Sequence, residues 1–209
     1  MRMFEKYASF YNLIYKNRDY KAEAKFVYKW AGKPKCIVDL GSGTGRHHKY
    51  WDCCVVGIDQ SKEMLRYCKP SKKRVYLQDN IEKLNLSYAP CYTALFNVIG
   101  YCDLDKVMSC LKQNKGDVFI FDCWDRDKVA KIGFKTKEKL FPWGKVNIIP
   151  YLGGLIILIT KKNGETVIEK HDAHPYSEKE IKRFCKKYGY SYIRKDTKTW
   201  TTYYKLTKT

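Results

Sequence analysis

The stretch that decides the fold is Val38-Asp-Leu-Gly-Ser-Gly-Thr-Gly45, in which a short apolar run leads directly into a glycine-rich turn. The run 36–40 is typical of a buried strand. Glycines that follow such a strand permit positive φ and let a ligand approach the backbone closely. Asp59 ends the next apolar run, about twenty residues on, where a carboxylate can hold two ribose hydroxyls. The sequence therefore predicts a nucleoside site at the ends of these two strands.

The spacing of the glycines argues against a dinucleotide ligand. A dinucleotide-binding turn has the pattern G-x-G-x-x-G, but here the third glycine, Gly45, comes one place early and Arg46 occupies the expected position. A nucleoside without a pyrophosphate fits this turn better.

Outward from the glycine turn, strands alternate with helix-length segments. Helices are expected at 20–30, through Tyr50, after a Ser61 cap and after an Asp103 cap. The strands are expected at 36–40, 53–59, 74–78, 91–99 and 117–122. This order predicts an α/β fold with a doubly wound, mostly parallel sheet of seven strands.

The last third has a different pattern. Short β-like runs fill 135–170, and Asn163-Gly164 between two of them is a strong hairpin signal. Ser177-Glu-Lys-Glu180 is a capping box that opens a helix ending at Gly189, and a terminal hairpin is expected at 192–196 and 199–206. We interpret the chain as one domain. Its expected parts are a helical lid (1–31), a cofactor-binding core (32–124), a β-rich substrate cover (125–170), and the final helix and strands (171–209).

The composition is that of a globular protein with a very basic surface. The net charge is +19, but the excess consists of 33 lysines against 8 arginines, and the lysines are scattered over the whole length. Bidentate recognition of phosphates and bases favours arginine. A solvated lysine surface is therefore our first interpretation, and a nucleic-acid face is the alternative.

The nine cysteines form no CxxC pair, and an odd number of thiols in apolar runs suits a reducing compartment. His171 and His174 lie near Asp172, but a third ligand at a convincing spacing is missing from the sequence, so no metal is expected. The most apolar stretch, 148–159, is short and broken by Pro150. We expect a cytoplasmic protein without a membrane partner, as a monomer or a homodimer.

Three segments carry a resemblance to a known family. VDLGSGTG, GIDQSKEML and QDNI resemble, in order and spacing, the cofactor motifs of class I methyltransferases that use S-adenosylmethionine. The resemblance implies that the glycine turn packs against the methionine part, that Asp59 binds the ribose, and that the following segments enclose the adenine. The positions implied for the cofactor are Tyr11, Tyr20, Gly41, Ser42, Gly43, Gly45, Asp59, Gln60, Met64, Asp79, Asn80, Ile81 and Phe96.

A narrower resemblance is found at both flanks. Segments 10–24, 95–101 and 171–177 are similar to parts of bacterial methyltransferases that act on amino groups of nucleotide-linked deoxysugars. In those enzymes the N-terminal tyrosines help to enclose cofactor and substrate, which here implies a lid around Tyr7, Tyr11, Tyr15 and Tyr20. The chain departs from the family at Asn12, which replaces the usual aspartate, and in a shorter segment between Asp122 and Lys170.

The chemistry expected is methyl transfer to an amino or hydroxyl group of a small polar metabolite, most consistent with a phosphate-bearing nucleotide sugar. A sulfonium methyl group is already activated, so such an enzyme mainly positions its acceptor and accepts a proton where needed. The candidates for acceptor contact or proton transfer are Tyr101, Asp122 and His171. An RNA methyltransferase is the alternative, although the sequence lacks the Asn/Asp-Pro-Pro-[Tyr/Phe] motif for a flipped base after its fourth strand.

Overall fold

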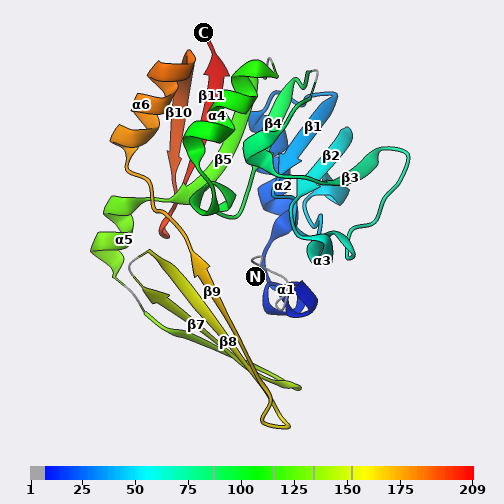
Figure 1. Ribbon diagram of the computed structural model, residues 1–209, viewed down its shortest axis with the longest axis vertical. Coiled ribbons are helices and arrows are strands. Elements are labelled where there is room, and N and C mark those ends of the chain that lie inside the picture. The colour runs from blue at the N-terminus through cyan, green and yellow to red at the C-terminus, as the bar shows by residue number, and fades with distance from the viewer. Residues whose placement is uncertain (1–7, 87, 115, 134, 152) are drawn as a thin grey trace.

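In the computed structural model, described over residues 8–209 except 87, 115, 134 and 152, two sheets are stacked end to end (Figure 1). The larger has seven strands in the order β10-β11-β5-β4-β1-β2-β3, and the smaller has four in the order β6-β7-β8-β9. The expected α/β fold with a mostly parallel seven-stranded sheet is confirmed.

The strands of the larger sheet are β1 (Cys36–Leu40), β2 (Cys54–Asp59), β3 (Arg74–Gln78), β4 (Cys91–Ala94), β5 (Val118–Trp124), β10 (Tyr190–Asp196) and β11 (Thr201–Lys208). β1 to β5 pair in parallel, whereas β11 runs antiparallel to both β5 and β10. β1, which lies between β4 and β2, is buried at four of its five positions because layers of helices cover both faces.

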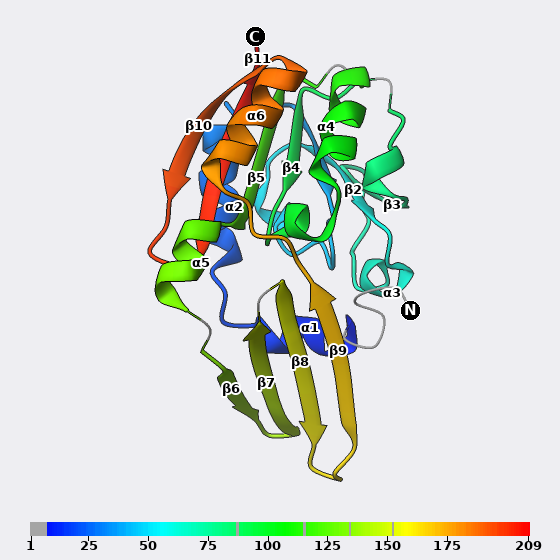
Figure 2. The ribbon, with the colours of Figure 1, turned by 60° about the vertical axis from the view of Figure 1, so that its left-hand side comes forward.

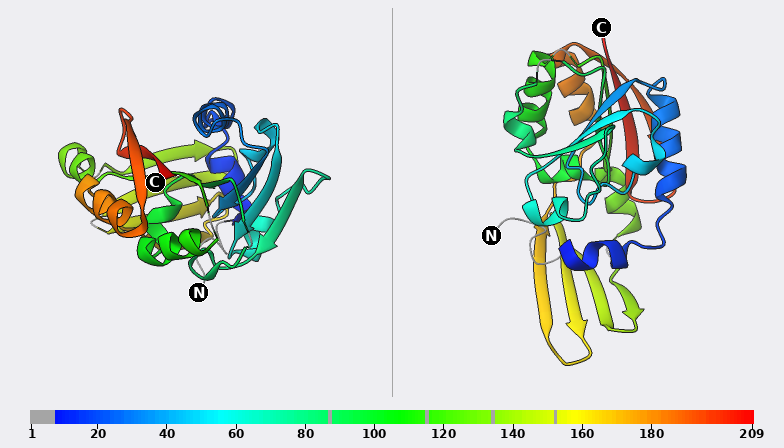
Figure 3. Two further views of the ribbon diagram at one scale, coloured as in Figure 1. Left: turned by 90° about the horizontal axis from the view of Figure 1, so that it is seen from above. Right: turned by 90° about the vertical axis from the view of Figure 1, so that its right-hand side faces the viewer.

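Helices cover both faces of this sheet, as Figure 3 shows. α2 (Tyr20–Trp30) covers one face, and α4 (Leu104–Gln113) and α6 (Glu178–Tyr188) cover the other. α3 (Lys62–Leu65) and α5 (Arg126–Ile132) lie beyond the lower end of the sheet in Figure 1. The 3-10 turns are η1 (His48–Tyr50), η2 (Ile81–Lys83) and η3 (Val98–Tyr101). Ser61, Asp103 and Ser177 cap their helices as expected, and Gly189 ends α6 in the left-handed conformation.

Helix α2 belongs to the sheet layer. Its Ala24 and Val27 are fully buried in a cluster with Ile37 and Ile120 of the sheet. Residues 20–30, which we expected in the lid, therefore pack on the core, and the described part of the lid is α1 (Ala8–Ile14). Tyr7, the first of the expected lid tyrosines, lies outside the described residues.

Two other expectations were wrong in extent. The helix expected through Tyr50 is replaced by turns and the short η1. Gly45 before it has a left-handed backbone, and Trp51 after it is extended. The strand expected to reach Ile99 ends at Ala94, since Phe96 and Asn97 adopt left-handed φ values of 72° and 62°.

The smaller sheet is an antiparallel meander of β6 (Lys137–Phe141), β7 (Gly144–Tyr151), β8 (Gly154–Lys161) and β9 (Thr166–Asp172). The Asn163-Gly164 turn joins β8 to β9, which confirms the expected hairpin. The chain enters this excursion through α5, so the stretch from 125 onward opens with a helix rather than a strand.

The excursion is closed at its base. Asp125 and Tyr176 form a parallel bridge, the amide of Arg126 donates to the Tyr176 carbonyl at 3.1 Å, and the amide of Tyr176 donates to the Trp124 carbonyl at 2.9 Å. The segment 126–175 therefore leaves the core and returns to it at one point.

Helix α1 lies against the smaller sheet, below the larger one (Figure 2). Ala8, Tyr11 and Ile14 share a buried cluster with Val146, Leu155 and Ile157. The two sheets and α1 thus face one another across the carboxyl ends of β1 and β4, where an α/β sheet carries its ligands.

Candidate active site

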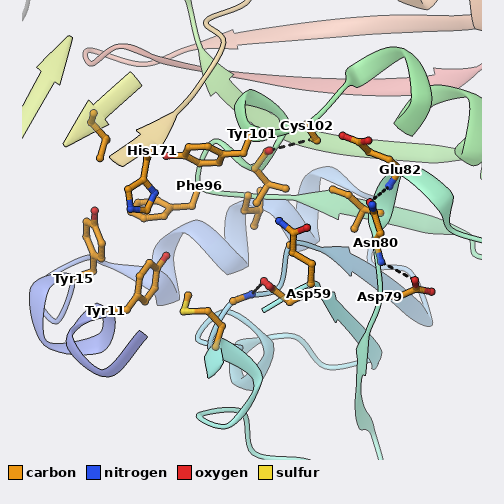
Figure 4. Close-up of a pocket in the computed structure, with 18 of the residues that line it drawn as sticks. Tyr11, Tyr15, Asp59, Asp79, Asn80, Glu82, Phe96, Tyr101, Cys102 and His171 are labelled. Carbon is orange, nitrogen blue, oxygen red and sulfur yellow. Dashed lines mark hydrogen bonds between the residues drawn. The ribbon is translucent and has the colours of Figure 1, made fainter. Parts of the chain in front are cut away.

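A cavity of about 290 Å³ lies between the two sheets (Figure 4). The segments that line it come from distant parts of the sequence. The predicted residues in its wall are Tyr11, Gly41, Gly43, Asp59, Gln60, Met64, Asp79, Asn80, Ile81, Phe96, Tyr101 and His171. Tyr15, one of the expected lid tyrosines, also lines the wall. The residues of the wall that we had not selected are Glu82, Leu95, Val98, Cys102, Leu155 and Ile157.

Four predicted residues do not line this cavity. Tyr20 and Ser42 line a smaller adjoining one of about 30 Å³, which shares Tyr11 and Phe96 with the first. Gly45 lines neither cavity. A Cβ there would stand 2.9 Å from the Tyr76 hydroxyl, so a glycine at this position lets the turn pack against Tyr76. The fourth is Asp122.

The glycine turn and Asp59 are bound to each other. The Gly43 amide donates to Asp59 Oδ2 at 2.7 Å, and the Ser61 amide donates to Oδ1 at 2.8 Å. Burial raises the pKa of Asp59, and these two donors oppose the rise. Each carboxylate oxygen retains lone-pair capacity for a further donor, as a ribose hydroxyl would supply.

The backbone of the turn needs glycine at its first two positions. Gly41 and Gly43 have φ of 66° and 55°, and a Cβ on Gly41 would overlap Val98 Cγ1 at 2.6 Å. The bare backbone here gives a cradle beside the cavity. Gln60 and Asp79 stand exposed at its mouth, on the side of Asp59.

Asp122 lies under the wall, where it holds the turn after β4. Its Oδ1 accepts from the Phe96 amide and its Oδ2 from the Asn97 amide at 3.3 Å. Burial raises its pKa to about 7, and Glu23 adds to the rise. Asp122 thus supports the two left-handed residues, and the geometry does not favour the acceptor contact that we had considered for it.

Arg18 and Glu23 anchor the junction between α1 and α2. Arg18 Nε donates to Glu23 Oε2 at 2.9 Å, and its guanidinium lies 4.2 Å from the centre of the Phe96 ring. Glu23 also accepts from Tyr203 and pairs with His47 Nε2 at 2.8 Å. Although burial alone would raise the pKa of Glu23, the bonds to His47 and Arg18 hold it at about 2. Sequence analysis missed this hub because its members lie up to 185 positions apart.

A second contact joins α1 to the glycine turn. Thr44 Oγ1 donates to Asn12 Oδ1 at 2.8 Å, and Arg46 Nη1 donates to the Asn12 carbonyl at 3.0 Å. Asn12, where the family pattern has an aspartate, thereby joins α1 to the residues that follow the glycine turn.

The far end of the cavity is aromatic. Tyr15 lies 4.8 Å from Phe96 and 5.0 Å from Tyr11 between ring centres, and Tyr101 lies 6.0 Å from His171. Burial raises the pKa of Tyr101 and lowers the pKa of His171 to about 4, so both are neutral near pH 7. Figure 4 shows both side chains on the wall opposite Asp59 and Asp79.

His174 is not part of this wall. It pairs with Arg126 at 3.0 Å and with Glu180 at 3.4 Å on the surface. Within the described ranges, no group of three or more metal-ligating side chains gathers. Nor does any helix in the described part of the chain have the length and apolarity to cross a bilayer.

Comparison with known proteins agrees with this geometry. Residues 38–115 match a family described as a methyltransferase domain. No curated protein matches the chain in sequence. Among solved structures, a methyltransferase of Clostridium acetobutylicum that depends on S-adenosylmethionine is 19% identical, covers 98% of each chain, and superposes with a TM-score of 0.76.

Two sugar-modifying enzymes superpose similarly. CalS10 of Micromonospora echinaspora, an amino pentose methyltransferase with bound S-adenosylmethionine, is 13% identical, with 100% of this chain and 99% of that chain covered at a TM-score of 0.77. KedS8 of Streptoalloteichus, a sugar N-methyltransferase, is 13% identical, with 95% and 92% covered at 0.72. At these identities the likeness establishes the fold. The family match covers residues 38–115, the part of the sequence that contains the glycine turn and Asp59.

Proposed function

We propose that the protein transfers the methyl group of S-adenosylmethionine to an amino group of a small polar metabolite, with a nucleotide-linked sugar as the favoured class. The observation that carries this proposal is one continuous cavity with a nucleoside-type end at Asp59 and an aromatic end at Tyr101 and His171. When bound, the cofactor supplies an activated methyl group, and the chain's own residues bind it, orient the acceptor and exclude water.

The residues of the first end suit the cofactor. Gly41 and Gly43 form the cradle for its methionine part, Asp59 meets the ribose hydroxyls, and Asp79, Asn80 and Ile81 border the adenine. A carboxylate is the usual partner for a vicinal diol because it can accept from both hydroxyls.

The aromatic end favours an amine over a hydroxyl. The Phe96 and Tyr15 rings already lie against Arg18 and Lys139, whereas the Tyr11 ring beside them can attract a cationic nitrogen, as in an arriving ammonium or a methylated product. A sugar hydroxyl would need a strong general base, whereas a neutral amine is already a nucleophile and an ammonium becomes one once one proton has left.

Lysines beside this end support a phosphate-bearing substrate. Lys139 Nζ lies 5.2 Å from the centre of the Tyr15 ring and donates to the Ile14 carbonyl at 2.9 Å, and Lys16 Nζ stands 5.9 Å from the Phe141 ring. Neither lysine lines the cavity. Both can therefore bind a diphosphate outside it while the sugar occupies the cavity.

The test is a methyl-transfer assay with radiolabelled S-adenosylmethionine across four acceptor classes: nucleotide-linked amino sugars, nucleotide-linked sugars without an amine, small amines and bulk tRNA. We expect label on the first class alone. Label on tRNA, retained at physiological salt, would establish the RNA alternative, because binding by counterion release alone fades as salt rises. Calorimetry that gives no heat with the cofactor or its demethylated product would overturn the proposal.

A further inference from the structure

We propose that Cys36 and Cys54 form a reversible disulfide, which joins β1 to β2 when the protein meets a small disulfide oxidant such as oxidised glutathione. The two cysteines are the first residues of these strands, whereas the cavity lies at the carboxyl ends of the same strands. Neither cysteine lines the cavity. The inference is therefore independent of the proposed methyl transfer.

The register of the two strands makes the cysteines neighbours. Cys36 pairs with Cys54 in the parallel ladder, and two positions on Val38 pairs with Val56. The two valines belong to the hydrophobic cluster that includes the buried side of α4. Since side chains alternate along a strand, the two thiols leave the same face of the sheet as these valines. Neighbouring strands lie about 4.8 Å apart, which is within the range of Cα separations that disulfides span, about 4.4–6.8 Å.

This pair of thiols is open to solvent. Cys54 is exposed and Cys36 is half-buried. The other cysteines at this end of the sheet, Cys53 and Cys91, are buried in the cluster on the opposite face, which includes the buried side of α2. An oxidant thus meets one accessible thiol with a second thiol beside it on the same face.

The surroundings of Cys54 are basic. Its amide donates to the Lys35 carbonyl at 3.1 Å, just before β1. The Val55 amide donates to the Lys73 carbonyl at 2.8 Å, just before β3. Both lysines are exposed, and Lys73 also pairs with Asp52 at 3.4 Å. Oxidised glutathione carries a net negative charge, so exposed cations on both flanking strands favour an anionic small disulfide as the oxidant.

The reaction is a thiol–disulfide exchange in two steps. The Cys54 thiolate attacks one sulfur of oxidised glutathione, the sulfur–sulfur bond breaks, and one glutathione leaves as a thiolate. The Cys36 thiolate then attacks the Cys54 sulfur and releases the second glutathione. Two protein thiols are oxidised to one disulfide, one glutathione disulfide is reduced to two thiols, and the leaving thiolates take up the protons that the cysteines lose.

The order of these steps follows from burial. Burial raises the pKa of the Cys36 thiol, and Cys54 beside it adds to the rise. The thiolate is the attacking form, so the exposed Cys54 reacts with the oxidant first and Cys36 resolves the mixed disulfide.

The disulfide encloses the glycine turn in the covalent loop 36–54. Closing a loop removes conformational freedom from the unfolded chain, so oxidation should raise the melting temperature, by about 2–8 °C for a chain of this size. The strand spacing is near the short end of the disulfide range, and a bond under such strain is readily reduced. The pair is therefore suited to a reversible stabilisation of the larger sheet.

The first test maps the bond. The folded protein is equilibrated with oxidised and reduced glutathione, free thiols are alkylated, and the peptides are identified by mass spectrometry. We expect a peptide pair linked through Cys36 and Cys54 that separates on reduction. In Cys36→Ser the reaction should stop after its first step, with glutathione on Cys54. A wild type that carries glutathione on Cys54 without the internal bond, or a bond that includes Cys53, would refute the proposal.

The second test measures stability. The oxidised wild type should melt about 2–8 °C above its reduced form, and Cys36→Ser should show no such difference. The control with one thiol fewer is Cys110→Ser, in which a hydroxyl can keep the hydrogen bond to the Glu82 carbonyl, and it should retain the difference. Equal melting temperatures for the linked and reduced wild type would refute the stabilising role. Neither test involves methyl transfer, so a protein inactive on every acceptor would refute the proposed function and leave both results valid.

Discussion

The two ends of the cavity are built in different ways. The cofactor end uses residues 41–81, a single stretch in which each loop follows a strand of one sheet. The acceptor end combines α1, the turn after β4 and two strands of the smaller sheet, from Tyr11 to His171. The first end is a property of local sequence, and the second exists only because tertiary packing brings distant segments together.

This difference teaches where specificity resides. The cofactor end has strong backbone constraints, since Gly41 cannot carry a Cβ beside Val98. The acceptor end is lined by side chains such as Tyr15 and Leu155, which can change without a change in backbone. Substitutions at the two ends should therefore affect different kinetic constants.

The largest expected effect follows removal of residues 1–16, which deletes α1 and leaves Arg18 paired with Glu23. Methyl transfer should fall to background, because the acceptor end loses the wall that excludes water. Far-UV circular dichroism should still show the folded sheet, and Leu13→Ala, an exposed change on α1, serves as the control. Turnover at the wild-type rate would show that the acceptor end does not depend on α1.

Tyr101→Phe removes one hydroxyl from the acceptor end. We expect kcat to fall by about 10- to 1000-fold if this hydroxyl orients the acceptor, with KM for the cofactor unchanged. Steady-state kinetics with both substrates varied separates the two constants. Tyr88→Phe, an exposed change, is the control, and equal rates for both variants would transfer the acceptor contact to His171.

Glu23→Gln tests the junction between α1 and α2. The folded pKa of Glu23, about 2, is below its ordinary value, so its contribution to stability is present above pH 4.5 and is lost as pH falls toward 2. The variant should lose roughly 3 kcal/mol at pH 7. Urea unfolding at several pH values measures this, and the gap between the proteins should narrow below pH 4.5. A gap that is constant with pH would assign the loss to packing.

Asp59→Ala should act on the cofactor end alone. It deletes charge-assisted bonds to the ribose, and calorimetry should show binding weakened by about 1.5–3 kcal/mol. The exposed Asp52→Ala is the control. A larger change in the KM for the acceptor than in the affinity for the cofactor would show that a substitution at one end alters the other.

Sequence reasoning predicted the strand, the glycine turn and the acid after the second strand because these signals are local. The strand–glycine–acid pattern places Gly43 and Asp59 within one hydrogen bond of each other. The strand that begins at Cys91 was predicted too long. It ends early because Asp122, 26 positions beyond Phe96, accepts hydrogen bonds from two backbone amides of the turn. Two successive left-handed residues without glycine have no signature in the sequence.

The acceptor end was predicted only in part. Tyr101 and His171 came from the family resemblance, and both line the cavity, although their contacts with an acceptor remain a proposal. The burial of Glu169 on β9 was not predicted, because an acid in a β-strand with alternating polarity is typical of a solvent-facing position. Only the pairing of β9 with β8, and the packing of α1 over them, shows that it faces inward.

The closed base of the 126–175 excursion has a consequence for how this protein could diversify. The Asp125–Tyr176 bridge holds the two ends of this segment together. A change in the length of the chain between them therefore leaves the positions where the chain leaves and re-enters the core unchanged. Doubling the length of such a loop adds only about 0.6 kcal/mol of closure entropy. Strands can therefore be gained or lost there, and the choice of acceptor altered, while the seven-stranded sheet keeps its order. The smaller sheet can therefore vary while the larger sheet, which carries the proposed cofactor end, stays the same.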